Sequence, residues 1–389
     1  MNKHWNLLAG AAVALTASAA TAGEMSYTTA SGSAGKQTIA NLGDAATFEE
    51  SSLLDNLWAL PTLYKGDGAI LQEFGLIGRY HGTYYDVDGD DQGSDDSWDN
   101  RRQRLGFSAA LFNQLDLEVQ FNVDYAQESD RFFKNIEDVA IEWSGIEGLG
   151  LAIGKFKPTV SREYNTSSKR IKTIERSLFV NQVVPEKVWG ASTDVEVGGL
   201  DVQVGAFAGD LDGDWDFSEF NAGYLLNAAV DFGDVRLSYL YNDGNEGNTG
   251  AEDYDNIVSL SYVNYGKKGY EGLGLFAEAM YADGDSSGYG ITLMPSYMIT
   301  DQLEAVVRVH HAGSDESDGL TVQKRYDRKV SDLSSKVGDQ YTGVYGGLNY
   351  YINGDKLKLM GGVEVGSFDQ DNGDSLDVVS LMAGVRIYF

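Results

Sequence analysis

The chain contains no cysteine and only four prolines, and nothing after its first 22 residues forms an apolar run of eighteen residues. The missing cysteine excludes disulfides and thiolate chemistry. The missing apolar run excludes a membrane-spanning helix in the mature chain. Basic residues are also few, because 29 Lys and Arg stand against 59 Asp and Glu, a net charge of −30. This balance argues against nucleic acid as a partner, since such binding needs a basic surface.

Alternation of apolar and polar residues runs through residues 71–389. Between 115 and 125 the odd positions are apolar and the even positions polar, so the two kinds lie on opposite faces of a strand. The final segment, 379–389, repeats this pattern and ends on Phe389. In a barrel that spans a membrane, the apolar face contacts lipid and the polar face lines the lumen.

Short and long connections alternate between these segments. The short ones are tight turns rich in Gly, Asn and Asp, such as 198–199 and 353–355. The longer polar stretches are 86–100, 126–134, 157–187, 209–221, 242–255, 282–288, 313–339 and 368–375. Bacterial outer-membrane barrels have even strand numbers, tight periplasmic turns and long external loops. The pattern therefore predicts an all-β fold, a 16-stranded antiparallel transmembrane β-barrel over 71–389.

The amino-terminal region differs from the barrel segments. Residues 1–22 have a basic start, an apolar run and an Ala-Thr-Ala ending, which predicts a secretory signal peptide. We expect 23–70 to form a periplasmic segment with a short helix near 48–60, where leucines recur at helical spacing before Pro61. A signal peptide followed by a barrel predicts the Gram-negative outer membrane, with lipid and lipopolysaccharide as surroundings.

The segment 157–187 carries seven basic and three acidic residues in an otherwise acidic chain. A long third loop that folds into the barrel would place this charge at a constriction, where it attracts anions. A solvated surface loop that pairs with lipopolysaccharide phosphates is the alternative. Strand alternation also predicts that Arg79, Arg102 and Arg104 face the lumen. Salt bridges across the wall would account for these charges equally well. The candidate channel residues are Arg79, Arg102, Arg104, Lys157, Arg162, Lys169, Arg170, Lys172 and Arg176.

Other motifs predict no chemistry. The Asp-rich stretches at 86–96 and 210–216 could hold Ca²⁺, but they lack the spacing of a known calcium loop, and solvated acidic loops explain them as well. Residues 284–288 match G-x-S-x-G, yet that motif needs a strand-to-helix turn, which the surrounding pattern does not predict. We expect no catalytic residues, no metal site and no cofactor.

Several short motifs resemble the phosphate-selective porin O and P family. They are 101–107 (RRQRLGF), 154–158 (GKFKP), 174–178 (IERSL) and 345–351 (YGGLNYY). The resemblance implies a sixteen-stranded homotrimeric barrel that passes anions along basic side chains. It places Arg102, Arg104, Lys157 and Arg176 at matching motif positions.

These observations predict a porin for passive diffusion of small hydrophilic solutes, with anions such as phosphate preferred. Two alternatives stay open at this point. The barrel could be an adhesin or structural protein with binding loops, or it could be a non-selective or cation-preferring porin.

Overall fold

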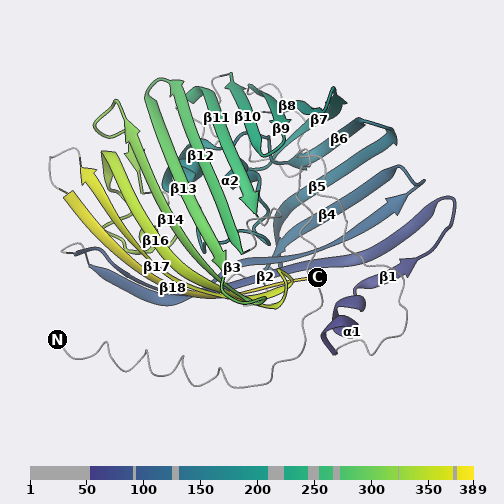
Figure 1. The fold of residues 1–389 in the computed structure, drawn as a ribbon, viewed down its shortest axis with the longest axis horizontal. Coiled ribbons are helices and arrows are strands. Elements are labelled where there is room, and N and C mark those ends of the chain that lie inside the picture. The colour runs from purple at the N-terminus through teal and green to yellow at the C-terminus, as the bar shows by residue number, and fades with distance from the viewer. Residues whose placement is uncertain are drawn as a thin grey trace.

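The computed structural model describes residues 53–90, 93–124, 131–208, 223–243, 254–265, 272–322, 324–370 and 375–389. Eighteen antiparallel strands share one sheet in this part of the chain. Two short strands, β1 and β15, only flank it, which leaves sixteen in a ring that closes where β18 pairs with β2 (Figure 1). The predicted 16-stranded antiparallel barrel is therefore confirmed.

The strands of the ring differ in length. Their bounds are β2 (Leu71–Asp88), β3 (Ser94–Leu111), β4 (Leu115–Val123), β5 (Phe133–Ile146), β6 (Leu149–Phe156), β7 (Val188–Val197), β8 (Leu200–Ala208), β9 (Tyr224–Phe232), β10 (Val235–Asn242), β11 (Tyr254–Tyr265), β12 (Leu273–Gly284), β13 (Ser287–Met298), β14 (Leu303–Ser314), β16 (Val337–Asn353), β17 (Leu357–Gln370) and β18 (Ser375–Tyr388).

The outer face of the barrel is apolar and the inner face is largely polar. On β10, Leu237 and Tyr239 are 47% and 39% exposed, whereas Arg236 and Ser238 are 6% and 1% exposed. Successive side chains of a strand alternate between faces, so the exposed set points outward. An apolar outer surface suits contact with lipid.

Tight turns join the strands at one end of the barrel. Phe112 and Asn113 both have a positive φ, 55° and 56°, and Gly198 and Gly199 have 62° and 82°. Consecutive positive φ angles match the right-handed twist of a hairpin, which is why Gly and Asn recur there.

Two predicted long loops were wrong. In place of a loop at 86–100, β2 continues to Asp88 and β3 starts at Ser94, and β12 and β13 leave only 285–286 between them. The backbone ladder continues through these stretches, where for example Asp86 pairs with Asp96. Polar composition misled the prediction because strands that extend beyond the lipid can be solvated on both faces.

The barrel seam is joined to an amino-terminal segment. Helix α1 (Leu53–Ala59) leads into β1 (Thr62–Lys65), which pairs with the start of β2 (Figure 1). The Trp58 indole donates a hydrogen bond to the carbonyl oxygen of Tyr388 at 2.6 Å. The predicted signal peptide and the rest of 23–52 lie outside the described residues. No helix in the described part of the chain is both long and apolar enough to span a membrane.

Candidate channel constriction

The third long connection, residues 157–187, lies inside the barrel (Figure 1). We call it the inward loop. It leaves β6, forms helices α2 (Arg162–Asn165) and α3 (Leu178–Val183), and returns to β7. Ser161 caps α2, since its hydroxyl accepts a hydrogen bond from the backbone N–H of Tyr164 at 3.0 Å. The loop therefore has a defined structure within the lumen.

An apolar core holds the inward loop against one side of the wall. Phe179 lies beside Gly290 of β13, where an added Cβ would come within 2.6 Å of its ring. The core joins apolar residues of the loop to inward residues of β9–β14, namely Val160, Ile174, Leu178, Phe179, Val180, Val183, Leu225, Leu240, Ile257, Met280, Met294 and Val306. Strand alternation alone did not foresee this core, because it assigned the inward faces to a charged, water-filled lumen.

Glu278 of β12 anchors the start of α2. Its carboxyl group accepts hydrogen bonds from the backbone N–H groups of Arg162 and Glu163 at 2.7 and 3.1 Å. It also accepts from the hydroxyls of Ser161 and Ser259 at 2.9 and 2.7 Å. Free N–H groups at the start of a helix need such acceptors. The wall thus supplies the partner that the short helix lacks.

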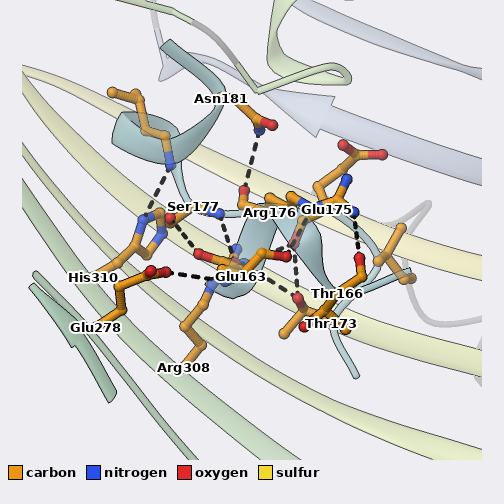
Figure 2. Close-up of polar contacts among 12 residues, drawn as sticks. Glu163, Thr166, Thr173, Glu175, Arg176, Ser177, Asn181, Glu278, Arg308 and His310 are labelled. Carbon is orange, nitrogen blue, oxygen red and sulfur yellow. Dashed lines mark hydrogen bonds and ion pairs between the residues drawn. The ribbon is translucent and has the colours of Figure 1, made fainter. Parts of the chain in front are cut away.

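Glu163 of the inward loop is the centre of a second buried cluster (Figure 2). Its carboxylate accepts from the backbone N–H of Ser177 at 3.0 Å and from the Ser177 hydroxyl at 2.6 Å. Arg308 of β14 donates to the same carboxylate at 3.1 Å and to Glu364 of β17 at 3.2 Å. Glu163 therefore joins both ends of the loop to the wall.

Side chains of the wall also bind backbone carbonyls along the middle of the loop. Lys358 donates to the carbonyl of Ile171 at 3.0 Å, and Arg386 donates to that of Ile174 at 2.7 Å. The inward loop is thus held by strands on several sides, and it cannot leave the lumen without exposing these buried cations.

Three of the candidate basic residues are neutralised by carboxylates. Arg104 lies 2.7 Å from Glu137, Arg162 pairs with Asp231, and Lys172 pairs with Glu304. These pairs link the inward loop or β3 to neighbouring strands. Their charges are therefore largely cancelled within the wall.

The other six candidates have no carboxylate within ion-pair distance among the described residues. Arg79 donates to the Ser168 hydroxyl at 2.6 Å, and Lys157 donates to the carbonyl of Tyr164 at 2.7 Å. Arg176 bonds only backbone carbonyls, Lys169 lies 4.8 Å above the ring centre of Tyr388, and Arg170 is exposed. Arg102, whose Nε atom has no hydrogen-bond partner in the described part of the chain, completes this group. We call the six the unpaired cations: Arg79, Arg102, Lys157, Lys169, Arg170 and Arg176.

Two of the unpaired cations also keep unused donors. The Nε atoms of Arg79 and Arg102 are buried and have no hydrogen-bond partner in the described part of the chain. Buried polar atoms are normally satisfied, so such donors suit water or an anion. The register shift between β2 and β3 leaves Arg101 as an extra residue beside Arg102, and Arg101 reaches Glu175 of the loop at 3.2 Å. Simple alternation along β3 would place Arg101 and Arg102 on opposite faces, so it did not predict that both point inward.

Titration within the inward loop reflects burial and crowded positive charge. Burial, followed by repulsion from Arg79, lowers the pKa of Lys169 to about 8. Burial and nearby Arg176 lower the pKa of Lys157 well below its usual value. Burial alone would raise the pKa of Glu175, but Arg101 and Arg102 outweigh it and lower that pKa. The unpaired cations therefore repel one another, and a bound anion would reduce this repulsion.

Carboxylates line another part of the inner wall. Asp116 of β4 lies directly across from Glu142 of β5, and Glu118 follows on the same face of β4. These side chains are partly exposed, unlike the buried inner residues of β10–β14. The inner wall along β4 and β5 is therefore less closely covered than that of β10–β14, and it carries carboxylates.

No group of residues suited to metal binding occurs in the described part of the chain. The G-x-S-x-G match at 284–288 lies in the hairpin between β12 and β13, without the helix that such a nucleophile requires.

Sequence reasoning missed a second loop that folds into the barrel, residues 315–322 and 324–336. The basic run 324–329 was a usable signal for it.

Comparison with known proteins agrees with this architecture. Residues 74–236 match the family model described as phosphate-selective porin O and P, which confirms the resemblance seen in the sequence motifs. No curated protein matches the chain.

Three solved structures illustrate the shared fold. The outer membrane channel DcaP of Acinetobacter baumannii has a TM-score of 0.52 and 14% identity, over 83% of this chain and 99% of that one. Salmonella typhi OmpF in complex with daunomycin has a TM-score of 0.55 and 12% identity, over 82% and 98%. A loop L8 deletion mutant of Vibrio cholerae OmpT has a TM-score of 0.51 and 13% identity, over 81% and 99%.

Proposed function

We propose that this protein is an outer-membrane porin for passive diffusion of small hydrophilic solutes, with anions such as phosphate preferred. The closed barrel, its apolar exterior and the match to the porin family support a channel rather than an enzyme. The resemblance to phosphate-selective porins supports the choice of anion. No cofactor takes part in this mechanism.

The observation that carries the anion preference is the group of unpaired cations. They lie on β2, on β3 and along the inward loop, and the Nε atoms of Arg79 and Arg102 lack partners among the described residues. Positive charge in a narrow, poorly screened passage attracts anions and repels cations. An anion that passes Lys169 and Arg170 replaces part of its hydration shell with these donors.

A general or cation-preferring porin is the second candidate, and the acidic wall of Asp116, Glu118 and Glu142 favours it. Opposed charges create a field across the route, which orients dipolar solutes as they pass. The balance depends on which charges lie nearest the solute at the narrowest point, since screening is weakest there.

Reversal potentials in a KCl gradient test the choice. We expect anion selectivity in the wild type and a shift toward cations after Lys169→Glu with Arg170→Glu. Lys65→Glu is the control, because Lys65 lies on β1 outside the ring of strands and is exposed. Cation selectivity in the wild type would remove the anion preference, and an unchanged potential in the double variant would remove the inward loop from the filter. Block of chloride current by added phosphate would identify phosphate as a solute.

The environment and assembly follow from the same proposal. We propose export by the 1–22 signal peptide, a periplasmic position for 23–70, an external position for the long loops, and contact of the apolar exterior with lipid and lipopolysaccharide. A homotrimer is proposed from the family resemblance.

Two measurements test the assembly and the channel. Native mass spectrometry in detergent should give the mass of three chains. Purified protein in a planar bilayer should give stepwise ohmic currents. Silence in the bilayer would favour an adhesin with a closed barrel.

A further inference from the structure

A second loop folds into the same end of the barrel as the inward loop. It joins β14 to β16, contains β15 (Leu320–Thr321) and the 3-10 helix η3 (Asp327–Lys329), and we call its described residues, 315–322 and 324–336, the capping loop. Its side chains Leu320, Tyr326 and Leu333 are between 0% and 1% exposed. External loops of barrels are ordinarily solvated, so this degree of burial needs a cause.

The capping loop reaches across the mouth to strands beyond its own hairpin. The Tyr326 ring stacks on Tyr85 of β2 with 5.0 Å between ring centres. Arg325 makes a two-pronged pair with Asp99 of β3 at 2.6 and 2.8 Å. Asp327 accepts from the Ser380 hydroxyl of β18 at 2.7 Å. The loop therefore covers the inner face of β16–β18 as well as β2 and β3.

A buried ionic cluster holds the capping loop down. The Lys324 ammonium lies 2.8 Å from Asp327 and 3.2 Å from Glu364 of β17, and it donates to the Tyr341 hydroxyl of β16 at 2.9 Å. Lys324 is 3% exposed and Glu364 is 1% exposed. The two carboxylates outweigh the effect of burial and raise the pKa of Lys324 well above its usual value. Removing one member would leave an uncompensated buried charge.

The capping loop also contacts the inward loop directly. The Gln182 amide of α3 donates to the carbonyl of Gly319 at 2.6 Å and accepts from the backbone N–H of Thr321 at 3.1 Å. Glu364 is shared as well, because Arg308 links it to Glu163. The two loops thus form one connected structure inside the barrel.

We propose that the capping loop is a second constriction, which sets the size limit for solutes at the external mouth while the inward loop sets the charge preference. This rests on the proposed porin function. Lys324 and Arg325 are paired with carboxylates and contribute little net charge. The capping loop therefore narrows the mouth by its volume, and its release should change which sizes pass without changing which charge passes.

The test compares Lys324→Gln with Lys336→Gln in the full-length protein. Lys336 lies on the same loop and pairs with no carboxylate in the described part of the chain. Three readouts apply: trypsin cleavage after the exposed residues Arg328 and Lys329, single-channel conductance, and swelling of proteoliposomes in sugars of increasing size. For Lys324→Gln we expect cleavage about tenfold faster, since a lost buried partner shifts local opening by a decade or more. We also expect higher conductance and entry of larger sugars, with a reversal potential of the same sign as in the wild type and no further shifted than in Lys336→Gln, which removes the same charge.

Each other outcome overturns part of the proposal. Faster cleavage with the same conductance and size limit would show that the capping loop does not narrow the pore. Unchanged cleavage would show that the Lys324 cluster does not hold it. If Lys324→Gln fails to insert, Arg325→Gln removes the pair with Asp99 and is judged by the same three readouts. Absence of any conductance in the wild type would refute the porin function itself, a result distinct from both.

Discussion

Replacing Glu278 with alanine should release the start of the inward loop while leaving the barrel intact. The Glu278 carboxyl group accepts four hydrogen bonds, two of them from the N–H groups of Arg162 and Glu163. Three of the four come from the inward loop, since Ser259 lies on β11 of the wall. A buried hydrogen bond contributes about 1 kcal/mol net, so these three together contribute about 3 kcal/mol to this anchor. That loss should raise the local opening equilibrium by about a hundredfold, since about 1.4 kcal/mol corresponds to a factor of ten.

Hydrogen–deuterium exchange in detergent micelles measures this opening. The amides of Arg162 and Glu163 should exchange far faster in Glu278→Ala, whereas amides within the β12 ladder should keep their protection because their partners are backbone groups. Glu118→Ala is the matched control: Glu118 also lies on the inner wall, and its carboxylate accepts a hydrogen bond from the Gln120 amide of its own strand. Wild-type exchange at Arg162 and Glu163 in Glu278→Ala would refute the assignment of Glu278 as the anchor.

Three further predictions concern titration and the barrel seam. Raising the pH from 7 to 9 should weaken anion selectivity, because Lys169, with a pKa of about 8, loses its charge in that window; Lys169→Met should reduce this change in reversal potential. Gly78→Val should slow insertion into the membrane, because an added Cβ would come within 2.2 Å of the Phe389 ring. A Cβ at Gly346 meets open space, so Gly346→Val should insert at the wild-type rate. The gel shift between unfolded and inserted protein measures both rates. Trp58→Phe should lower the free energy of unfolding by about 1 kcal/mol in a denaturant titration, because the hydrogen bond to the Tyr388 carbonyl is lost. Leu57→Ala, at an exposed position, should change that free energy little.

The strand pattern was sufficient to determine the architecture. Alternation with a period of two is a local property, and the tight turns carry their own chemistry, so the 16-stranded barrel and its apolar exterior could be predicted from residues such as 115–123 and 379–388. The basic character of 157–187 was equally visible, because charge is counted along the chain. The predicted loops at 86–100 and 282–288 were wrong, because the strands there continue beyond the residues whose alternation marks them as strands.

Only the tertiary structure decided which charges are free. Arg162 and Arg176 look alike in the sequence, yet Asp231 neutralises the first, while the second donates hydrogen bonds to backbone carbonyls and lies over the Tyr164 ring. Their partners come from strands far along the chain, and the extra residue at Arg101 depends on the pairing of β2 with β3. The apolar core under the inward loop and the inward course of the capping loop arise in the same way. Such contacts depend on the closure of the barrel, which brings together residues that no local pattern relates.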